Sequence, residues 1–398
     1  MKFDIWKECP KVPLPSVLLT VVDNRGKTVP TAPSGHKLIA TNCVRNENLY
    51  PVYEKIRYLS EETYRTWFRA HPEPGDIIFV CKGTPGRVCL VPDPIDFCIA
   101  QDMVALRADP KIVYNKYLLA VLRSFQIQEQ ILSTSVGDVI PHFKKSFFDQ
   151  IMIPIPNMDI QKSIGDFYYT ISEKTELNKK INDNLLEQMQ ALYKSWFVDY
   201  RPFGGVMPTS WTQNGIYSLA NIIYGAPFAS KQFNTEGNGK PIIRIRDLKD
   251  QQFATYTTEV HPKGYLLHPG DIVVGMDGEF RPYIWGNDEA WLNQRVCVFE
   301  NKRPNGKAFL YFTIKPLLFA IEQTQVATTV IHIGKKDFDT FEIMLPDTEL
   351  LDAFDAITTP MVEQIVSNSI ENKRLAIMRD ALLPKLMSGE IDVSDIQL

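Results

Sequence analysis

The sequence predicts an α+β protein in which two mixed α/β domains are separated by two long coiled-coil helices, forming a pseudo-two-fold internal repeat. Three observations predict this fold class: a length of 398 residues, a heptad pattern that occurs twice, and sequence blocks that recur in the same order about 190 residues apart. A chain of this length exceeds one ordinary core and is typical of two domains of roughly 150 residues.

Paired segments that share both sequence and order define the repeat. The pairs are PGDIIFVCKG and PGDIVVGMDG, IAQDMVAL and LNQRVCVF, and KKSFFDQIMIPIP and KKDFDTFEIMLP, and a long helical stretch follows each member of the last pair. Offsets of 190 to 195 residues indicate two copies of one unit with loop insertions. Short β-rich runs such as IIFV and IVVG, bounded by Gly, Pro and Asp, predict a mixed sheet in each copy. We expect Asp76 and Asp271, in the PGD turns, to bond nearby backbone amides.

Both long helices show an apolar repeat of seven residues, which is the pattern of a coiled coil. The repeating positions are Ile164, Ile171, Asn178, Leu185 and Leu192 in the first helix, and Phe354, Met361, Asn368, Leu375 and Leu382 in the second. We expect the positions between them to be filled by Phe167, Ile181, Ile357 and Met378. Each helix has one asparagine in mid-seam, and a polar seam residue can fix helix register. Asn178 and Asn368 are therefore predicted to set how the helices align. Two ordinary surface helices remain the alternative.

These patterns divide the chain into five parts. We expect a domain at 1–156, a helix at 157–200, a second domain at 201–346, a second helix at 347–388 and a tail at 389–398. One packing helix is predicted per domain, at 114–132 and at 307–324, to cover the sheet. Pro384 and Gly389 are read as the signals that end the second long helix.

Composition argues against several classes of protein. The net charge is −4 and no apolar run approaches the ~20 residues of a membrane span, so we expect a cytoplasmic protein without a membrane partner. The start, MKFDIWKECPKVPLP, lacks the long apolar stretch of a signal peptide. The six cysteines form no CxxC pair, which favours reduced thiols over a zinc site. No phosphate loop, HExxH, GxSxG or dinucleotide turn occurs, so we expect a binder and spacer without catalytic residues and without a metal.

A DNA reader needs positive charge for phosphates, and Arg, Asn or Gln for base edges. Loops of the first domain supply Lys82, Arg87, Gln101, Thr134, Ser135, His142, Lys144 and Lys145. Loops of the second supply Arg244, Arg246, Arg281, Asn293, Gln294, Thr328, Thr329, His332, Lys335 and Lys336. The paired lysines are the strongest candidates because both copies keep them beside the same strand. We expect them to contact phosphates, while the two histidines can equally be solvent-exposed loop residues.

The assembled pattern resembles the specificity subunit of type I restriction-modification systems. IPIPNMDIQKSIGDFYYTISEKTELNKKINDNLLEQMQALYKSWFVDY is similar to the central conserved region of that family, and IENKRLAIMRDALLPKLMSGEIDV to its distal one. MPTSW followed by GKPIIRIRDL is similar to the start of a second target recognition domain. The resemblance covers essentially the whole chain and is most specific in the helices.

This resemblance implies a non-catalytic subunit that reads double-stranded DNA. Each target recognition domain would read one half of a split target, with the two helices packed antiparallel as a spacer and a docking platform. Two methyltransferase subunits and restriction-translocation subunits are the implied partners, and S-adenosylmethionine, ATP and magnesium are expected on those subunits. Residues 158–197 as a helix would span about 60 Å, which exceeds one DNA turn of about 34 Å.

Three other interpretations remain. The chain could itself cut or methylate DNA, or it could be a coiled-coil scaffold that does not touch DNA. It could also be the DNA-recognition subunit of a related phage-defence or modification-only methyltransferase complex.

Overall fold

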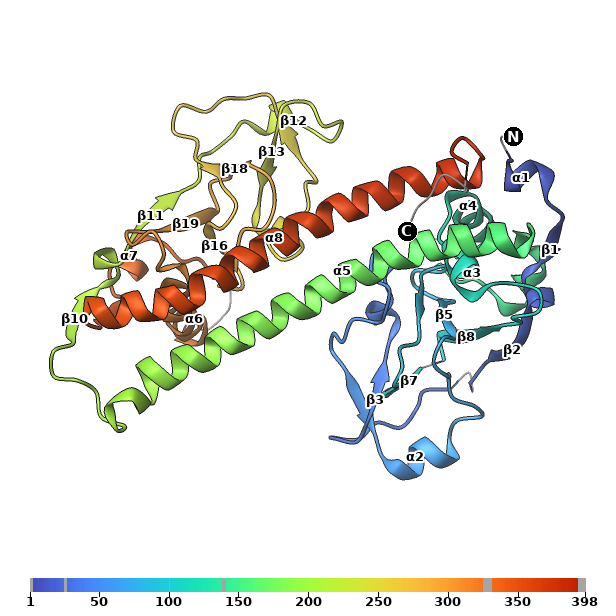
Figure 1. Cartoon of the computed structure of the whole chain (residues 1–398), viewed down its shortest axis with the longest axis horizontal. Coiled ribbons are helices and arrows are strands. Elements are labelled where there is room, and N and C mark those ends of the chain that lie inside the picture. Colours follow the sequence, from blue (N-terminus) through green and yellow to red (C-terminus); the bar gives the residue numbers. More distant parts are fainter. Residues whose placement is uncertain (1–2, 25–26, 100, 138–140, 325–330, 393–398) are drawn as a thin grey trace. The chain divides into compact units, whose positions relative to one another are not determined.

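The computed structural model describes residues 3–24, 27–99, 101–137, 141–324 and 331–392. The chain divides into two compact units (Figure 1): unit 1 comprises residues 1–176 and 374–398, and unit 2 comprises residues 177–373. Each unit therefore contains one sheet-rich domain and part of both long helices. In the described part of the chain, no helix has an apolar stretch sufficient to cross a membrane.

Unit 1 is built on a four-stranded sheet of order β2-β8-β5-β6, beside a three-stranded sheet β4-β3-β7 and a pair β1-β9. Its strands are β1 Lys11–Pro13, β2 Leu18–Val22, β3 His36–Ile39, β4 Arg57–Leu59, β5 Ile77–Val80, β6 Val88–Leu90, β7 Phe97–Ile99, β8 Met103–Ala108 and β9 Met152–Pro154. Its helices are α1 Ile5–Glu8, α2 Glu61–Thr66, α3 Asn115–Leu122 and α4 Phe125–Thr134, followed by the start of the long α5 Met158–Tyr193.

Unit 2 repeats this plan with a four-stranded sheet β11-β19-β16-β17, a five-stranded sheet β12-β14-β13-β18-β15 and a pair β10-β20. Its strands are β10 Thr212–Gly215, β11 Ala220–Tyr224, β12 Phe233–Asn234, β13 Lys240–Ile243, β14 Tyr256–Thr257, β15 Leu266–Leu267, β16 Ile272–Gly275, β17 Pro282–Ile284, β18 Ala290–Leu292, β19 Val296–Asn301 and β20 Glu342–Leu345. Its helices are α6 Lys307–Thr324, α7 Lys335–Phe338 and the long α8 Thr348–Met387, whose last turns belong to unit 1.

The central strands β5 and β16 are buried on both faces. Ile77 and Phe79 join the core that α3 and α4 cover, whereas Ile78 and Val80 point into a second core against the three-stranded sheet. Ile272 and Val273 divide between two cores of unit 2 in the same way. Because side chains alternate between the faces of a strand, burial on both faces requires the continuous apolar runs IIFV and IVVG.

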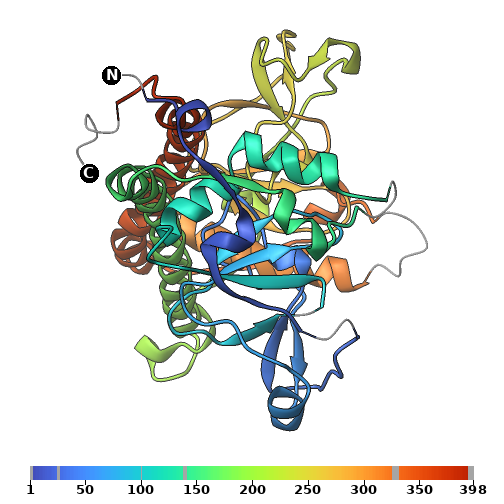
Figure 2. The same ribbon diagram turned by 90° about the vertical axis from the view of Figure 1, so that its right-hand side faces the viewer.

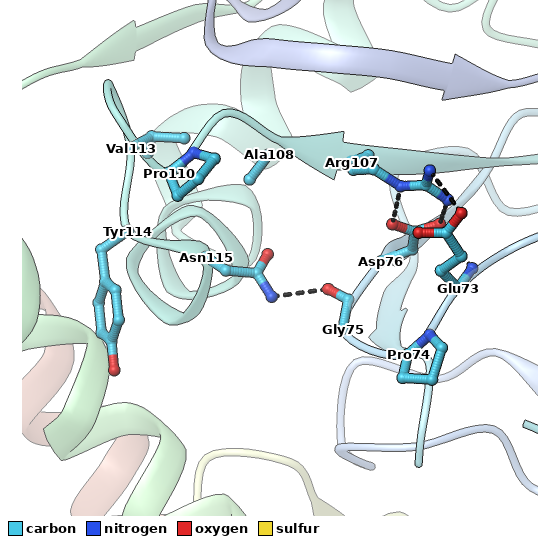
Figure 3. Close-up of a pocket in the computed structure, with 10 residues that line it drawn as sticks. All are labelled: Glu73, Pro74, Gly75, Asp76, Arg107, Ala108, Pro110, Val113, Tyr114 and Asn115. Atoms are coloured by element: carbon cyan, nitrogen blue, oxygen red, sulfur yellow. Dashed lines mark hydrogen bonds and ion pairs between the residues drawn. The ribbon is translucent and has the colours of Figure 1, made fainter. Parts of the chain in front are cut away.

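The PGD turns precede these central strands and behave as predicted. Asp76 Oδ2 accepts the backbone N–H of Glu73 at 2.8 Å, and Asp271 Oδ2 accepts that of His268 at 2.9 Å. Asp76 also holds the guanidinium of Arg107 through two bonds of 2.9 Å, beside a pocket at the start of α3 (Figure 3). Among the described residues, Asp271 pairs with no arginine; its Oδ2 accepts the Tyr265 hydroxyl at 3.1 Å, and burial raises its pKa. The turns themselves are therefore the repeated feature, and the ion pair belongs to unit 1.

Two predicted features of the helices need correction, and a third agrees with the structure. The single helix expected at 114–132 is two helices, α3 and α4, because the chain turns at Arg123 and Ser124. The predicted helix at 307–324 coincides with α6. Pro384 does not end α8, which continues to Met387. A proline removes one backbone donor without halting the helix here, and Gly389, with φ of +67°, follows the actual end.

The helices α5 and α8 lie side by side (Figure 2). They are antiparallel within each unit, because Phe167 packs with Leu386 in unit 1, and Met189 lies in the same cluster as Phe354 in unit 2. Ile164, Ile171 and Phe354 are buried, and Phe167 is buried as expected. The other predicted intermediate positions, Ile181, Ile357 and Met378, are exposed, so this part of the prediction is wrong. The seam instead uses residues four positions after each heptad residue, such as Asn182, Met189 and Ile365. Three- and four-residue steps both return to one helix face, so spacing alone does not distinguish them.

An asparagine quartet, Asn178, Asn182, Asn368 and Asn372, lies in the part of the seam that belongs to unit 2. Asn178 Nδ2 donates to Asn372 Oδ1 at 2.9 Å, and Asn368 Nδ2 donates to Asn182 Oδ1 at 2.8 Å. Asn178 and Asn368 are 1% and 4% exposed. The two bonds are related by the internal repeat, since Asn178 corresponds to Asn368 and Asn182 to Asn372. Asn178 and Asn368 thus each bond the partner helix, and they do not bond each other.

We predict that Gly165→Ala destabilises the protein by about 1–3 kcal/mol, because a methyl group there would lie 2.6 Å from the backbone N of Tyr117. The backbone of α3 cannot yield as a flexible side chain would. Gly215→Ala is the matched control, since no atom lies within 4 Å of its added Cβ. Urea unfolding checks both variants, and equal midpoints would refute the close approach of α5 and α3.

We also predict that Asn182→Leu costs about 1–3 kcal/mol, because it leaves the Nδ2 group of buried Asn368 without its acceptor. The double variant Asn182→Leu/Asn368→Leu should recover most of this loss, since an apolar pair leaves no buried donor unpaired. Urea unfolding of the two single variants and the double variant measures the coupling, with exposed Asn184→Leu as control. Strictly additive costs would show that the two amides do not interact.

Candidate nucleic-acid interface

In each unit, the segment that carries the paired lysines is bonded to the turn after the central strand. Phe143 N donates to Cys81 O at 2.8 Å and Gly83 N to Pro141 O at 2.9 Å. Unit 2 repeats both bonds, from Ile333 N to Met276 O at 2.9 Å and from Gly278 N to Ile331 O at 3.0 Å. Backbone bonds therefore bring two loops that are far apart in sequence to one place.

We call this place the strand-end edge. It comprises Lys82, His142 and Lys144 in unit 1, and Asp277, Arg295, His332, Lys335 and Lys336 in unit 2. Lys82 pairs with His142, and Asp277 with His332, as isolated antiparallel bridges. Two predicted histidines and four predicted lysines thus lie at this edge, with His142 and His332 at equivalent positions.

The strand-end edge lies at the far end of the central strand from the long helices. In unit 2 the PGD turn before β16 reaches α8, where a Cβ on Gly270 would lie 3.9 Å from Val366. In unit 1 the corresponding turn bonds Asn115, and the adjacent Tyr114 hydroxyl donates to Asp166 of α5 at 2.8 Å. Four strand residues extend about 13 Å. Each unit therefore holds the helices at one end of its sheet and offers its loop lysines at the other.

Four predicted cations are already paired within the chain, including Arg246, whose Nε lies 3.8 Å from Asp247 Oδ1. Lys145 is paired with Asp23, and Arg244 lies 3.5 Å from Asp247 and bonds Thr255. Arg281 is held by Glu322, with one bond of 3.1 Å, and this hydrogen bonding raises the pKa of Arg281 and lowers that of Glu322. An ion pair of this kind makes a loop more rigid and lowers the charge left for DNA.

The other candidates are placed as follows. The Thr134 and Ser135 hydroxyls donate to backbone carbonyls at the end of α4, of Gln130 and Ile131. Arg87 and Gln101 are half-buried in turns, Asn293 is half-buried and Gln294 exposed in the β18–β19 turn, and the Arg246 side chain is 69% exposed. Thr328 and Thr329 lie outside the described residues. The structure thus gathers part of the predicted set and leaves several members in other loops.

Two residues of the strand-end edge were missed by sequence reasoning. Asp277 Oδ1 lies 2.6 Å from His332 Nδ1, and Asp277 Oδ2 lies 3.7 Å from Arg295 Nε. Arg295 Nη1 lies 3.4 Å from His332 Nδ1. The three residues come from three separate loops, so only the fold brings them together. The repeat could have indicated Arg295, because Arg295 directly follows the predicted candidates Asn293 and Gln294.

Over the residues that the structure describes, no group of three or more His, Cys, Asp and Glu side chains is arranged to hold an ion. The six cysteines are free thiols, and burial raises the pKa of Cys81, beneath the strand-end edge of unit 1, to about 12. Cys81 is consequently a neutral, apolar residue at physiological pH.

Comparison with known proteins gives one consistent result. The family model described as "Type I restriction modification DNA specificity domain" matches residues 32–187 and again 208–371. The chain is 38% identical over 138 residues to the specificity subunit of the type I restriction enzyme EcoBI of Escherichia coli, covering 34% of this chain and 29% of that protein. It is 23% identical over 407 residues to the HindI specificity subunit of Haemophilus influenzae, covering 80% of this chain and 86% of that protein.

A crystal structure of a type I restriction-modification S subunit from M. genitalium has the same fold. The TM-score is 0.56 at 16% identity, over 97% of this chain and 98% of that one. The two domain matches coincide with the two copies of the sheet-rich unit.

We predict that Lys335→Ala/Lys336→Ala weakens DNA binding and lowers the slope of log K against log salt by up to about 1.8, at about 0.9 per phosphate contact. Both lysines are exposed at the start of α7. Binding is measured by fluorescence anisotropy over a series of salt concentrations. Lys194→Ala should leave the slope unchanged, because Lys194, just after α5, is paired with Asp199 at 2.9 Å and lies away from the strand-end edge. A double variant with the wild-type slope would remove these lysines as phosphate contacts.

Proposed function

Because this chain belongs to the type I restriction-modification DNA specificity family, we propose that each of its units reads one half of a split DNA target. Membership makes the chain a DNA-recognition subunit with two specificity domains, not an enzyme. The proposal concerns how the two domains divide the DNA target between them.

The duplicated strand-end edge carries this proposal. Both units repeat the sheet order, the backbone bonds that hold the loop, and the exposed lysines beside them. Lysines that contact phosphates orient a protein on DNA, while neighbouring loop side chains read base edges. Two such edges on two separate units support a target of two short sequences with an unread gap between them.

The long helices support a spacer role. α5 and α8 take part in the cores of both units, so the same pair of helices connects the two sheet-rich domains. We propose that the length of this helix pair sets the unread gap. The asparagine quartet supports a single register because a one-step slip would leave buried amides unpaired.

The proposal assigns catalysis to other chains in the cytoplasm. Two methyltransferase subunits would use S-adenosylmethionine, and restriction-translocation subunits would use ATP and magnesium. The target adenine must leave the base stack to be methylated. The methyltransferase would therefore depend on this subunit to hold the DNA in a fixed position.

The test of the proposed function is selection from a duplex library. The chain, co-purified with its methyltransferase, is incubated with DNA carrying two randomised blocks at varied separations, and bound duplexes are sequenced. We expect two short preferred sequences at one fixed separation. A single contiguous site, or no preferred sequence, would contradict the proposal.

A lengthened helix pair gives a sharper prediction. The variant would carry one additional heptad in each long helix. In α5 it is inserted between Glu176 and Leu177 and copies 170–176. In α8 it is inserted between Lys373 and Arg374 and copies 374–380. Both insertions fall at the boundary between the compact units, so contacts inside each unit are kept. Seven residues add about 10 Å of helix, or about three base pairs.

The selected gap should therefore grow by about three base pairs while both half-sites stay unchanged. Library selection with the lengthened chain checks this result. An altered half-site, or an unchanged gap with full binding, would rule out the helix pair as the determinant of the gap.

A further inference from the structure

We propose that Arg295 reads a guanine in the half-site of unit 2 and that Asp277 is its positioning residue. This inference rests on the proposed function and extends it to a named side chain. It begins from the ion pair at the strand-end edge, where Asp277 Oδ2 lies 3.7 Å from Arg295 Nε.

A comparison of the contacts made by arginine side chains in unit 2 supports the choice of Arg295. Arg281 and Arg303 are each held by carboxylates through their terminal nitrogens, and Arg244 bonds Thr255 through Nη2. Arg295 has a carboxylate, Asp277, facing Nε and remains 53% exposed, and Arg246 has a similar pair with Asp247 at 3.8 Å. Arg295 is chosen because it lies at the strand-end edge, with Nη1 3.4 Å from His332 Nδ1. A guanine presents O6 and N7 as two acceptors in the major groove, and a guanidinium meets both through a pair of N–H donors. The Arg295 guanidinium is held by Asp277 at Nε and lies beside His332 at Nη1, while about half of the side chain remains exposed.

His332 completes the positioning of Asp277. Its Nδ1 lies 2.6 Å from Asp277 Oδ1, so one carboxylate oxygen faces the histidine and the other faces the arginine. The backbone supports the same arrangement, because Met276 N donates to Arg295 O at 2.9 Å and Ile333 N donates to Met276 O at 2.9 Å. A long side chain held in this way loses less conformational entropy on binding, which is the physical basis of a selective contact.

The internal repeat shows that this position varies while its backbone does not. In unit 1 the bond equivalent to Met276 N with Arg295 O joins Cys81 N to Asp102 O at 2.8 Å. Asp102 therefore stands where unit 2 has Arg295, and Lys82 stands where unit 2 has Asp277. The two charges are exchanged on one backbone framework. A carboxylate cannot make the guanine contact, so the effect of Arg295 is confined to one half-site.

The test compares variants of the full chain, co-purified with its methyltransferase, on the library that defines the wild-type target. Arg295→Ala should lower the preference for guanine at one base pair of one half-site by about ten- to a hundredfold. All other positions should keep their preferences. Arg295→Lys keeps the charge but loses the paired donors, so it should lose the same preference with an unchanged salt slope.

The positioning role of Asp277 is tested by asking whether its effect on the guanine preference requires Arg295. Asp277→Ala should lower the same guanine preference, and Asp277→Glu should restore part of it. Added to Arg295→Ala, the Asp277→Ala change should have no further effect at that base pair, because the positioning role acts only through the arginine. A purely structural aspartate would instead lower binding to all sequences in both backgrounds.

Arg201→Ala is the matched control. Arg201 has the same 3.7 Å ion pair between Nε and a carboxylate oxygen, from Asp199, and is 74% exposed, but it lies just beyond the end of α5. It should leave every base preference unchanged. Uniform weakening by Arg295→Ala with a reduced salt slope would make Arg295 a phosphate contact, and an unchanged target would make it a loop residue; either overturns the inference. A wild-type chain that selects no split target would contradict the proposed function itself.

Discussion

Everything in this structure depends on the antiparallel contact between α5 and α8, because each domain uses that contact to complete its own core. In unit 1, Ile164 of α5 and Leu383 of α8 lie in the same apolar cluster as the sheet and α3. In unit 2, Met189 of α5 and Phe354 of α8 do the same. The two helices belong to different copies of the repeat. Neither sheet-rich domain can therefore bury its apolar face without side chains that the other copy supplies, which couples domain folding to helix pairing.

The polar centre of the helix pair is the second consequence of this arrangement. Between the two apolar clusters the seam contains amides in place of leucines, and burial of an amide is tolerated only when its hydrogen bonds are made. The repeat supplies two equivalent bonds, Asn178 to Asn372 and Asn368 to Asn182, and Asn178 Nδ2 also donates to Glu371 at 2.7 Å. Among the described residues, the buried Asn178 Oδ1 accepts no hydrogen bond. An apolar centre would allow several alignments of similar energy, whereas paired amides make one alignment distinct. The apolar clusters therefore supply most of the stability, and the asparagine quartet favours a single helix register.

The sequence predicts the features that arise from local periodicity. The heptads, the PGD turns and α6 follow from spacing and turn chemistry, which act over a few residues. The sequence does not predict which side chains are buried or paired when this depends on residues that are close in space but far apart along the chain. Ile181 and Met378 fit the heptad spacing but are exposed, because the seam is filled by the adjacent four-residue steps. Arg281 and Lys145 look like free cations until the fold brings Glu322 and Asp23 to them. The Asp277–Arg295 pair was missed for the same reason, since its members lie in separate loops.

One backbone framework is used twice, with different side chains in the two units, and this is the physical basis of the proposal that the two units read different sequences. The bonds from Cys81 to Asp102 and from Met276 to Arg295 are equivalent, and so are the bonds that attach the lysine-bearing segments. These bonds involve only main-chain atoms, so they place few restrictions on the side chains they position. Lys82 and Asp102 in one unit, and Asp277 and Arg295 in the other, accordingly carry opposite charges on the same scaffold. Recognition can diverge at these positions at little cost in stability, because the exposed side chains contribute little to the core while the backbone bonds keep their place.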